Sequence, residues 1–416
     1  MFTEQANPYI RIRSIPAGSA LRGINVVLLF VFVFNAVFIP WGTFGLKVAA
    51  LGALLILNLS VFLTADSPDE KLILFFGLAL TAFVIVLSAL LTGEIILNIR
   101  LGYSGFMLLL YTIAKHHRID LEKLIHGMIF VLAVFVVVNV ILHVLGMLDV
   151  LENPVLKWLL KTTNFSVKKG AKADFGIAIS PKSGPLLAIS ISYLISKRKF
   201  ALAAIPVAAM MLTGTRANLI IAILLVLGCL VFVSQNRVVR WFTGIFLGLC
   251  VIAVLLEGQV WQYFTGVFLR EAGSDAIRAG LLREVLDVWR ENPLRFLTGS
   301  GFSGTIHSTV RRGAYIYSLE ISYWNLLRQV GLIPFILMMT MYLYPVVRLI
   351  KRGMVTISLG FIAYLIIAYT NPYLYSTTGL LGLLFMYYVC FDREGYIPER
   401  ENSVRNLENK YLKTQA

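Results

Sequence analysis

Charged residues are scarce in this sequence of 416 residues: they make up 14% of it, whereas hydrophobic residues make up 58%. Soluble globular domains carry roughly 25% charged residues. This composition therefore excludes a soluble fold and predicts an all-α polytopic membrane protein. Cysteine is rare too, and Cys229, Cys250 and Cys390 all lie within apolar runs. Their placement excludes a disulfide framework and metal-ligand spacing.

Motifs that bind nucleotides or metals are absent as well. The sequence has no Asp-x-Asp pair, no G-x-x-x-x-G-K-[ST] loop and no His or Asp cluster at metal-ligand spacing. We therefore expect no metal, no cofactor and no nucleotide sugar. No cleavable signal peptide is visible, because the first apolar run is long enough to remain as a signal anchor.

Apolar runs of about twenty residues, the length that crosses a bilayer, recur along the chain. They predict about twelve transmembrane helices in a single membrane domain, residues 1–416. The runs lie near 24–40, 45–64, 71–92, 95–114, 124–148, 175–195, 199–213, 215–233, 238–257, 319–345, 354–371 and 373–391. The positive-inside rule then places both termini in the cytoplasm, together with the basic segments 115–123, 196–199, 235–240 and 346–353.

One long hydrophilic loop, residues 258–318, interrupts the apolar pattern on the outer side. Its stretch DAIRAGLLREVLDVWREN predicts an amphipathic helix. Arg278 falls on the apolar arc of that helix. It is either a snorkelling arginine or one that binds an anion. Arg311 and Arg312 add positive charge to the same loop.

Two further cations lie at the outer ends of predicted spans. Lys182 stands between Pro181 and Pro185, which break the helix, and ionisable residues in membranes usually face a cavity and serve function. Arg216 opens a span, so its guanidinium group lies at a helix N-terminus that favours anions. The alternative is that Arg216 anchors the helix at the lipid headgroups.

The span predicted at 319–345 brings one carboxylate to this side. Glu320 stands in its first turn, and Arg328 follows eight residues later on nearly the same face. Glu320 either interacts with the helix dipole or serves as a base among the cations. His307 is a second candidate base, although a loop histidine is often an ordinary surface residue.

These residues together suit a diphosphate at a membrane surface, which implies a polyprenyl-linked substrate. Basic side chains would bind the diphosphate and stabilise its departure from a sugar, while Glu320 or His307 would accept the proton of the attacking hydroxyl. The candidate catalytic residues are Glu320, Arg278 and His307. The candidate diphosphate ligands are Arg216, Arg278, Lys182, Arg328, Arg311 and Arg312.

Three segments resemble O-antigen polymerases and O-antigen ligases. They are LTGTRANLIIAILL, the Arg278 region followed by Pro293-Leu294 and Gly299-Ser300-Gly301-Phe302, and EISYWNLLRQVGLIPF, all within residues 212–335. The resemblance implies a GT-C-like glycosyltransferase of the bacterial inner membrane. Such an enzyme polymerises undecaprenyl-diphosphate-linked oligosaccharide repeat units of O-antigen or a related surface polysaccharide at the periplasmic face. Arg216 and Arg278 would then bind diphosphate, and Glu320 would be the acceptor-side base.

The same resemblance ranks the alternatives. Ligases, which transfer glycan to lipid A-core, usually show His-Asn where this chain has Glu320-Ile321, so the sequence favours a polymerase; His307 lies thirteen residues too early to be the family's histidine. A flippase or exporter of the lipid-linked oligosaccharide ranks third, because transporters place charged sites near the midplane. The expected partners are the lipid-linked oligosaccharide, membrane lipids and a chain-length regulator protein, and no nucleic acid is expected.

Overall fold

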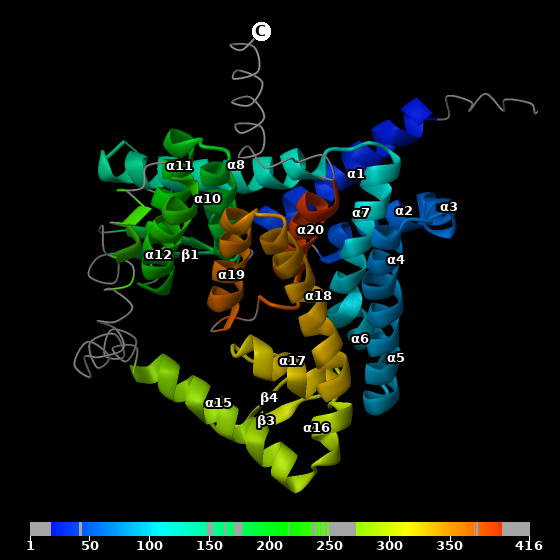
Figure 1. Ribbon diagram of the computed structural model, residues 1–416. Coiled ribbons are helices and arrows are strands. Elements are labelled where there is room, and N and C mark those ends of the chain that lie inside the picture. Colours follow the sequence, from blue (N-terminus) through cyan, green and yellow to red (C-terminus); the bar gives the residue numbers. More distant parts are fainter. Residues whose placement is uncertain are drawn as a thin grey trace, which may run out of the picture.

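The computed structural model describes residues 18–40, 44–147, 153–161, 164–169, 177–214, 216–234, 238, 240–241, 243–245, 248, 272–369, 371 and 373–392. Most of these residues are helical (Figure 1). In the first half of the chain the elements are α1 (Gly18–Phe38), α2 (Phe44–Leu57), α3 (Leu59–Leu63), α4 (Pro68–Leu74), η1 (Phe75–Leu80), α5 (Thr81–Thr92), α6 (Ile95–Gly102), η2 (Tyr103–Leu109), α7 (Leu110–His116), α8 (Leu121–Val144), α9 (Pro154–Lys161), β1 (Phe165–Lys169) and β2 (Ile177–Pro181). They are followed by η4 (Gly184–Leu186), α10 (Leu187–Ser196), α11 (Phe200–Met211), α12 (Arg216–Val233), α15 (Ala272–Glu291), α16 (Leu294–Thr298), β3 (Ile306–Ser308), β4 (Ala314–Ile316), α17 (Ser322–Val330), α18 (Leu332–Lys351), α19 (Val355–Tyr369) and α20 (Thr377–Asp392).

The described part of the chain has five helical stretches that are long and apolar enough to cross a membrane. These are Ala20–Phe38, Pro68–Thr92, Ile95–His116, Leu121–Val144 and Leu332–Lys351. Shorter apolar helices lie at Gly45–Leu57, Gly184–Ser196, Phe200–Met211, Asn218–Val233, Val355–Tyr369 and Thr377–Phe391. The protein is therefore mostly helical, as a membrane protein of the all-α class is. The predicted total of about twelve crossings stays a prediction, and most of the run at 238–257 lies outside the described residues.

We call the helices outside residues 272–331 the helical body, and within it α10 packs closely against its neighbours. This helix contacts α11, α12 and α19, which surround it in Figure 1. The approach to α19 is so close that a Cβ atom on Gly360 would lie 1.8 Å from the Ser192 Oγ. Lipid offers no hydrophobic drive for helix association, so small residues at such contacts allow the van der Waals packing that holds the helices together.

The run predicted as a span at 175–195 is only partly helical. β1 and β2 form an antiparallel pair with Phe165 opposite Pro181, and the helix begins at Gly184. The predicted break near Lys182 is present, because Pro181 ends the strand and Pro185 lies at the start of η4. Proline fits the first helical turn, where its missing N–H is not needed.

The run predicted as one span at 319–345 is divided at Gly331 into α17 and α18. Gly331 has a φ of +80°, and a Cβ atom there would lie 2.3 Å from the Leu297 carbonyl oxygen. Gly299 has the matching constraint, since its Cβ would lie 2.4 Å from the Gln329 carbonyl oxygen. Only glycine fits where two backbones approach this closely. Because α17 begins at Ser322, Glu320 precedes this helix and does not lie in the first turn of a span.

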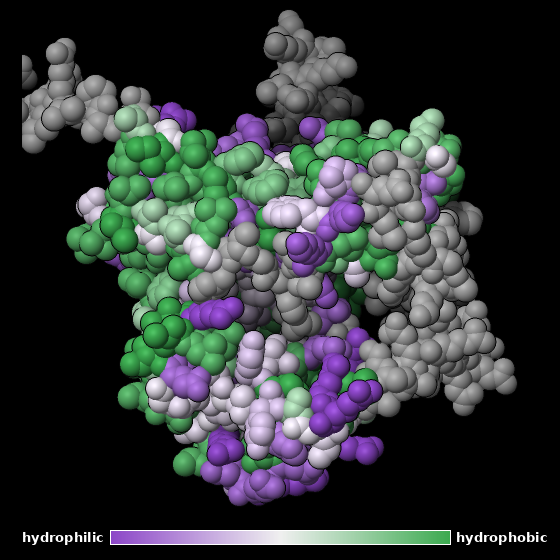
Figure 2. Space-filling view, turned by 180° about the vertical axis from the view of Figure 1, so that it is seen from behind, coloured by the Kyte–Doolittle hydropathy of each residue, from purple (hydrophilic) through white to green (hydrophobic). Residues whose placement is uncertain are grey.

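We call residues 272–331 the polar lobe. It contains α15, α16, α17 and the β3–β4 hairpin at the lower end of the molecule in Figure 1, and hydrophilic residues gather there in Figure 2. The amphipathic helix predicted around Arg278 is confirmed as α15. Its inner face contributes to a small core made of Leu281, Val285, Trp289, Ile306, Leu319, Ile321 and Leu327.

Candidate active site

Glu320 lies between two arginine side chains from different parts of the polar lobe. Arg311 Nη2 donates to Glu320 Oε1 at 2.7 Å, and Arg278 Nε lies 3.8 Å from Oε2. The side chains of Glu320 and Arg311 are each 40% exposed, and that of Arg278 is 23% exposed. We call these three residues the Arg–Glu cluster. The cluster is therefore partly accessible to solvent. An exposed ion pair contributes at most about 1 kcal/mol to stability, so these contacts hold the three side chains only weakly.

The helix α15 positions both arginines. It carries Arg278 itself, and six residues further on Glu284 Oε1 accepts hydrogen bonds from Thr309 Oγ1 at 2.9 Å and from the Val310 N–H at 3.1 Å. A Cβ atom on Gly280 would lie 2.5 Å from Val310 Cγ2, so the hairpin turn rests directly on the helix. These contacts fix the residue before Arg311 and thereby hold the second guanidinium group beside Glu320.

The electrostatics of Glu284 agree with this role. Burial alone would raise the pKa of its carboxyl group, but hydrogen bonds from Ser308, Val310 and Thr309 outweigh burial and lower the pKa below its ordinary value. Glu284 is therefore ionised at neutral pH and acts as a hydrogen-bond acceptor for the hairpin turn.

A tyrosine from the helical body also lies near Glu320. Burial, and then the negative charge of Glu320, raise the pKa of Tyr373 to about 12. Tyr373 lies between α19 and α20, and the Ser322 hydroxyl donates to the Asn371 carbonyl in the same connection. The cluster therefore stands at the α19–α20 end of the body. No local sequence pattern indicates Tyr373, because it is close to Glu320 only in the folded chain.

Arg328 lies in the interior of the polar lobe and is fully buried. Its guanidinium group donates to the carbonyl oxygens of Gly304 at 2.7 Å and Tyr317 at 2.8 Å, and to Asn325 Oδ1 at 3.0 Å. Burial lowers its pKa to about 10, so it remains protonated at neutral pH. These contacts join three segments of the polar lobe, and the role of Arg328 as a diphosphate ligand stays a prediction.

His307 and Arg312 lie on the exposed side of the hairpin. His307 stands opposite Tyr315 in the β3–β4 pair, with ring centroids 5.1 Å apart. Arg312 is exposed and has a φ of +60° in the turn. Within the described residues, neither side chain forms a hydrogen bond or ion pair with Glu320.

Lys182 and Arg216 belong to a different neighbourhood. Lys182 lies in the turn after β2, and its N–H donates to the Asn164 carbonyl at 2.8 Å. Arg216 is the first residue of α12, and its side chain lies outside the described part of the structure. The two segments adjoin, because the Ile179 N–H in β2 donates to the Leu212 carbonyl at 3.1 Å. The predicted cations thus fall into two groups, one on the lobe and one at the ends of α10 and α12.

The Gly299–Gly304 loop ties the lobe to the helical body. The Ser303 N–H donates to Asn98 Oδ1 and the Ser303 hydroxyl to Thr92 Oγ1, each at 3.0 Å, and Asn98 Nδ2 donates back to the Ser303 oxygen. The glycine pattern quoted for the resemblance therefore has a packing role here: it lets the loop lie against Thr92, which would be 2.6 Å from a Cβ on Gly301.

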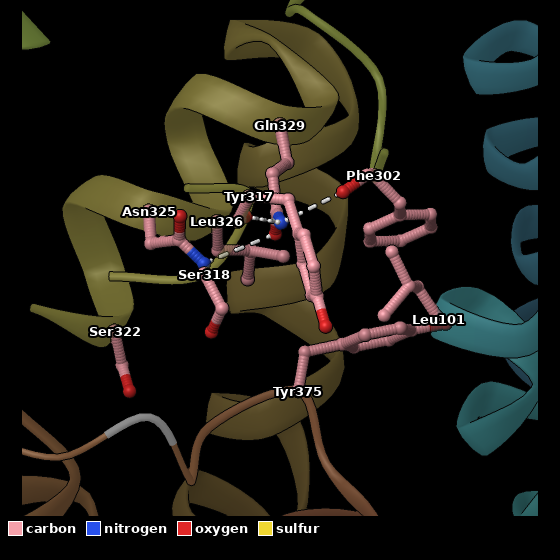
Figure 3. Close-up of a pocket in the computed structure, with 9 residues that line it drawn as sticks. All are labelled: Leu101, Phe302, Tyr317, Ser318, Ser322, Asn325, Leu326, Gln329 and Tyr375. Carbon is pink, nitrogen blue, oxygen red and sulfur yellow. Dashed lines mark hydrogen bonds between the residues drawn. The ribbon is translucent and has the colours of Figure 1, made fainter. Parts of the chain in front are cut away.

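A pocket of about 80 Å³ is lined by Ser318 and Ser322, which flank Glu320 in the sequence. We call it the serine–amide pocket. Asn325 and Gln329 of α17 lie on one side of it and the rings of Phe302 and Tyr375 on the other (Figure 3). It is lined by Leu101, Phe302, Tyr317, Ser318, Ser322, Asn325, Leu326, Gln329 and Tyr375. The sequence did not predict this pocket. The spacing of Asn325 and Gln329, which are one helical turn apart, was a signal that could have indicated it.

The Arg–Glu cluster brings two guanidinium groups to one carboxylate. Such a group can bind an anion and present a carboxylate beside it. In the described part of the chain, no group of three or more His, Cys, Asp or Glu side chains is arranged to hold a metal ion. No protein-family model matches the chain, and no curated protein matches it.

Proposed function

We propose that this protein is a membrane glycosyltransferase that polymerises lipid-diphosphate-linked oligosaccharide repeat units. The donor would be an oligosaccharide linked to undecaprenyl diphosphate, and the reaction would take place at the periplasmic face of a bacterial inner membrane. The observation that carries the proposal is the pair of guanidinium groups on one accessible carboxylate, Glu320. It combines an anion-binding charge with a proton acceptor.

The two arginines supply the donor site. Guanidinium groups bind phosphate oxygens in a bidentate manner and stay charged at any physiological pH. A diphosphate carries more negative charge than Glu320 and would compete with it for Arg278 and Arg311. Lys182 and Arg216 form the second group of cations, and they are proposed to attract the anionic lipid-linked donor on the membrane side. Binding of the donor would then free Glu320 for chemistry.

The reaction follows from these roles. A hydroxyl oxygen of the acceptor sugar forms a bond to the anomeric carbon of the donor sugar, and the bond from that carbon to the diphosphate oxygen breaks. The hydroxyl proton passes to Glu320 as general base. The leaving lipid diphosphate takes the electron pair, and Arg278 and Arg311 stabilise the charge that develops on it. The energy comes from the donor, so no nucleotide is consumed.

The test is a reconstitution in liposomes. Purified protein is supplied with lipid-diphosphate-linked repeat units and no nucleotide, and the products are separated by length. We expect a ladder of longer glycans, which Arg278→Ala and Glu320→Gln abolish and Arg283→Ala, on the exposed face of α15, preserves. A ladder that persists in the first two variants would refute the Arg–Glu cluster as the site.

Two other outcomes would identify a different function. Transfer only to added lipid A-core, with no ladder, would make the protein an O-antigen ligase. Movement of labelled donor between leaflets without any glycosidic bond formation would make it a flippase or exporter.

A further inference from the structure

The serine–amide pocket has a polar wall whose hydrogen-bonding groups are fixed in direction. Gln329 Nε2 donates both of its hydrogens, to the Phe302 carbonyl at 3.2 Å and to the Tyr317 carbonyl at 2.9 Å. Its Oε1 atom must therefore face Asn325, whose Nδ2 donates to it at 3.2 Å. Asn325 Oδ1 in turn accepts from Arg328 at 3.0 Å. Both amides are oriented by the protein before any ligand arrives.

For a ligand, this wall retains a donor on Asn325 and one acceptor lone pair on each of Asn325 and Gln329. Each amide group has two N–H hydrogens and two oxygen lone pairs. One Nδ2 hydrogen of Asn325 and one Oε1 lone pair of Gln329 are not used by the contacts described above. The opposite side of the pocket is apolar, since the rings of Phe302 and Tyr375 are stacked with centroids 5.3 Å apart and Leu101 lies beside them in Figure 3. No charged residue lines the pocket.

The size of the pocket limits what it can hold. The pocket has a volume of about 80 Å³, which exceeds the space that a single water molecule needs. A small polar substituent of a sugar ring fits a space of this size. A neutral group with a donor, an acceptor and a small apolar end matches the two walls. An acetamido group has these three features.

The location of the pocket relates it to the proposed chemistry. Ser318 and Ser322 both line it, and each is two residues from Glu320. Two residues of extended chain span about 7 Å at most. The backbone of Glu320 therefore lies within the reach of a bound sugar.

We infer that the serine–amide pocket is the acceptor subsite and binds the acetamido group of an N-acetylated sugar. The assignment of this pocket to the acceptor rests on the proposed function, whereas binding of the acetamido group does not require catalysis. The acetamido carbonyl accepts from Asn325 Nδ2, its N–H donates to Gln329 Oε1, and its methyl group packs on Phe302 and Tyr375.

Ligand-observed saturation-transfer NMR on the purified full-length protein tests the inference. The probes are the methyl glycosides of N-acetylglucosamine and N-acetylgalactosamine, with methyl glucoside and methyl galactoside as their matched partners. We expect transfer to the acetyl methyl group of at least one N-acetyl sugar, and clearly less transfer to its parent hexoside. Equal transfer to the parent, or none to either N-acetyl sugar, would overturn the inference.

Variants at one residue locate the binding. Ser318 is exposed and forms no hydrogen bond among the described residues, so Ser318→Phe should fill the pocket without removing a structural contact. We expect Ser318→Phe to lose the signal and Ser318→Ala to keep it, while both unfold at the temperature of the unaltered protein. Leu101→Phe narrows the pocket from the other side and should also lose the signal. A signal that survives in both phenylalanine variants would place the sugar elsewhere.

The outcomes separate this inference from the proposed function. Pocket-dependent binding without a glycan ladder would leave the subsite standing and refute the polymerase. A ladder formed from repeat units that contain no acetamido sugar, at the rate seen with N-acetylated units, would refute the acetamido assignment and leave the polymerase standing.

Discussion

Two arginine–carboxylate contacts in this protein differ in a way that separates structure from function. Arg348 Nη1 donates to Asp69 Oδ1 at 2.6 Å, and its guanidinium group lies 4.7 Å from the centre of the Phe391 ring. The Asp69 side chain is 16% exposed. Glu320 is 40% exposed and is shared by Arg278 and Arg311, with the Arg278 contact stretched to 3.8 Å.

We call the Arg348–Asp69 contact the closed pair, and we call the Arg–Glu cluster the open cluster. A partly buried pair with one cation per carboxylate has no charge left for a ligand, and breaking it costs stability. An exposed carboxylate with two arginines contributes little stability, and an anionic ligand can compete with it for the two guanidinium groups. The comparison predicts that variants of the closed pair change folding and variants of the open cluster change activity.

The largest effect is expected for Glu320→Gln. Loss of a general base lowers the rate by about 10²–10⁴, so kcat for polymerisation should fall by that factor. The KM for the donor should not rise, because both arginines remain. Glu291→Gln, at the exposed end of α15, is the matched control. A kcat like that of the unaltered protein would exclude Glu320 as the base.

Arg278→Ala should follow closely. Removing one group that stabilises charge in the transition state typically costs about 10²–10³ in kcat. Arg278→Lys should restore part of the activity, because the charge returns without the guanidinium geometry. Steady-state rates of ladder formation measure this, with Arg283→Ala as control. Equal losses in Arg278→Ala and Arg283→Ala would argue that α15 acts only through its folding.

A smaller effect separates neighbours in the hairpin turn. Arg311 contacts Glu320 and Arg312 does not, so Arg311→Ala should weaken donor binding while Arg312→Ala should not. A hydrogen bond to a charged group contributes about 1.5–3 kcal/mol, which corresponds to roughly a 10- to 100-fold rise in donor KM. An equal rise in both variants would mean that general positive charge, and not the cluster, attracts the donor.

The closed pair should behave in the opposite way. Asp69→Asn leaves Arg348 without its anion and should lower the free energy of unfolding by about 1–3 kcal/mol, between the values for exposed and buried pairs. Thermal unfolding in detergent measures the loss, and activity per folded molecule should stay unchanged. A stable Asp69→Asn variant with impaired activity would break the comparison.

The smallest effect concerns the pH dependence of the hairpin. Burial would raise the pKa of Glu284, but its hydrogen bonds lower that pKa below its ordinary value of 4.5. The carboxylate therefore stabilises the folded hairpin fully above about pH 4.5, and this contribution is lost as pH falls through the lowered pKa. Hydrogen exchange at Val310 should be faster in Glu284→Gln than in the unaltered protein at pH 7. The two proteins should converge in acid, and a constant difference would contradict this role.

Some of the site was predictable because single residues broke a local pattern. Arg278 interrupts the apolar arc of its helix, and in the structure it faces Glu320. The helical class and α15 follow from apolar length and from the 3.6-residue period. These signals are local, and local physics is sufficient to interpret them.

Other features depend on contacts that no local pattern contains. Arg328 has the sequence signature of an intramembrane cation, yet the carbonyls of Gly304 and Tyr317 surround it. The break at Gly331 exists because the Gly299 backbone lies against it. The approach of Tyr373 to Glu320 joins segments far apart in the chain. A polar Asn325-x-x-Arg328-Gln329 face on α17 was the one local signal of the pocket.

The most direct test of the donor site is the binding of a short-chain isoprenyl diphosphate to the detergent-solubilised protein. Calorimetry compares its affinity with that of the matching monophosphate. The diphosphate should bind more tightly, and its affinity should fall with added salt because the contacts are between accessible charges. The double variant Arg278→Gln, Arg311→Gln should lose at least about tenfold in affinity, whereas Asp69→Asn should bind normally. Unchanged diphosphate affinity in the double variant would contradict the claim that these two arginines form the donor site.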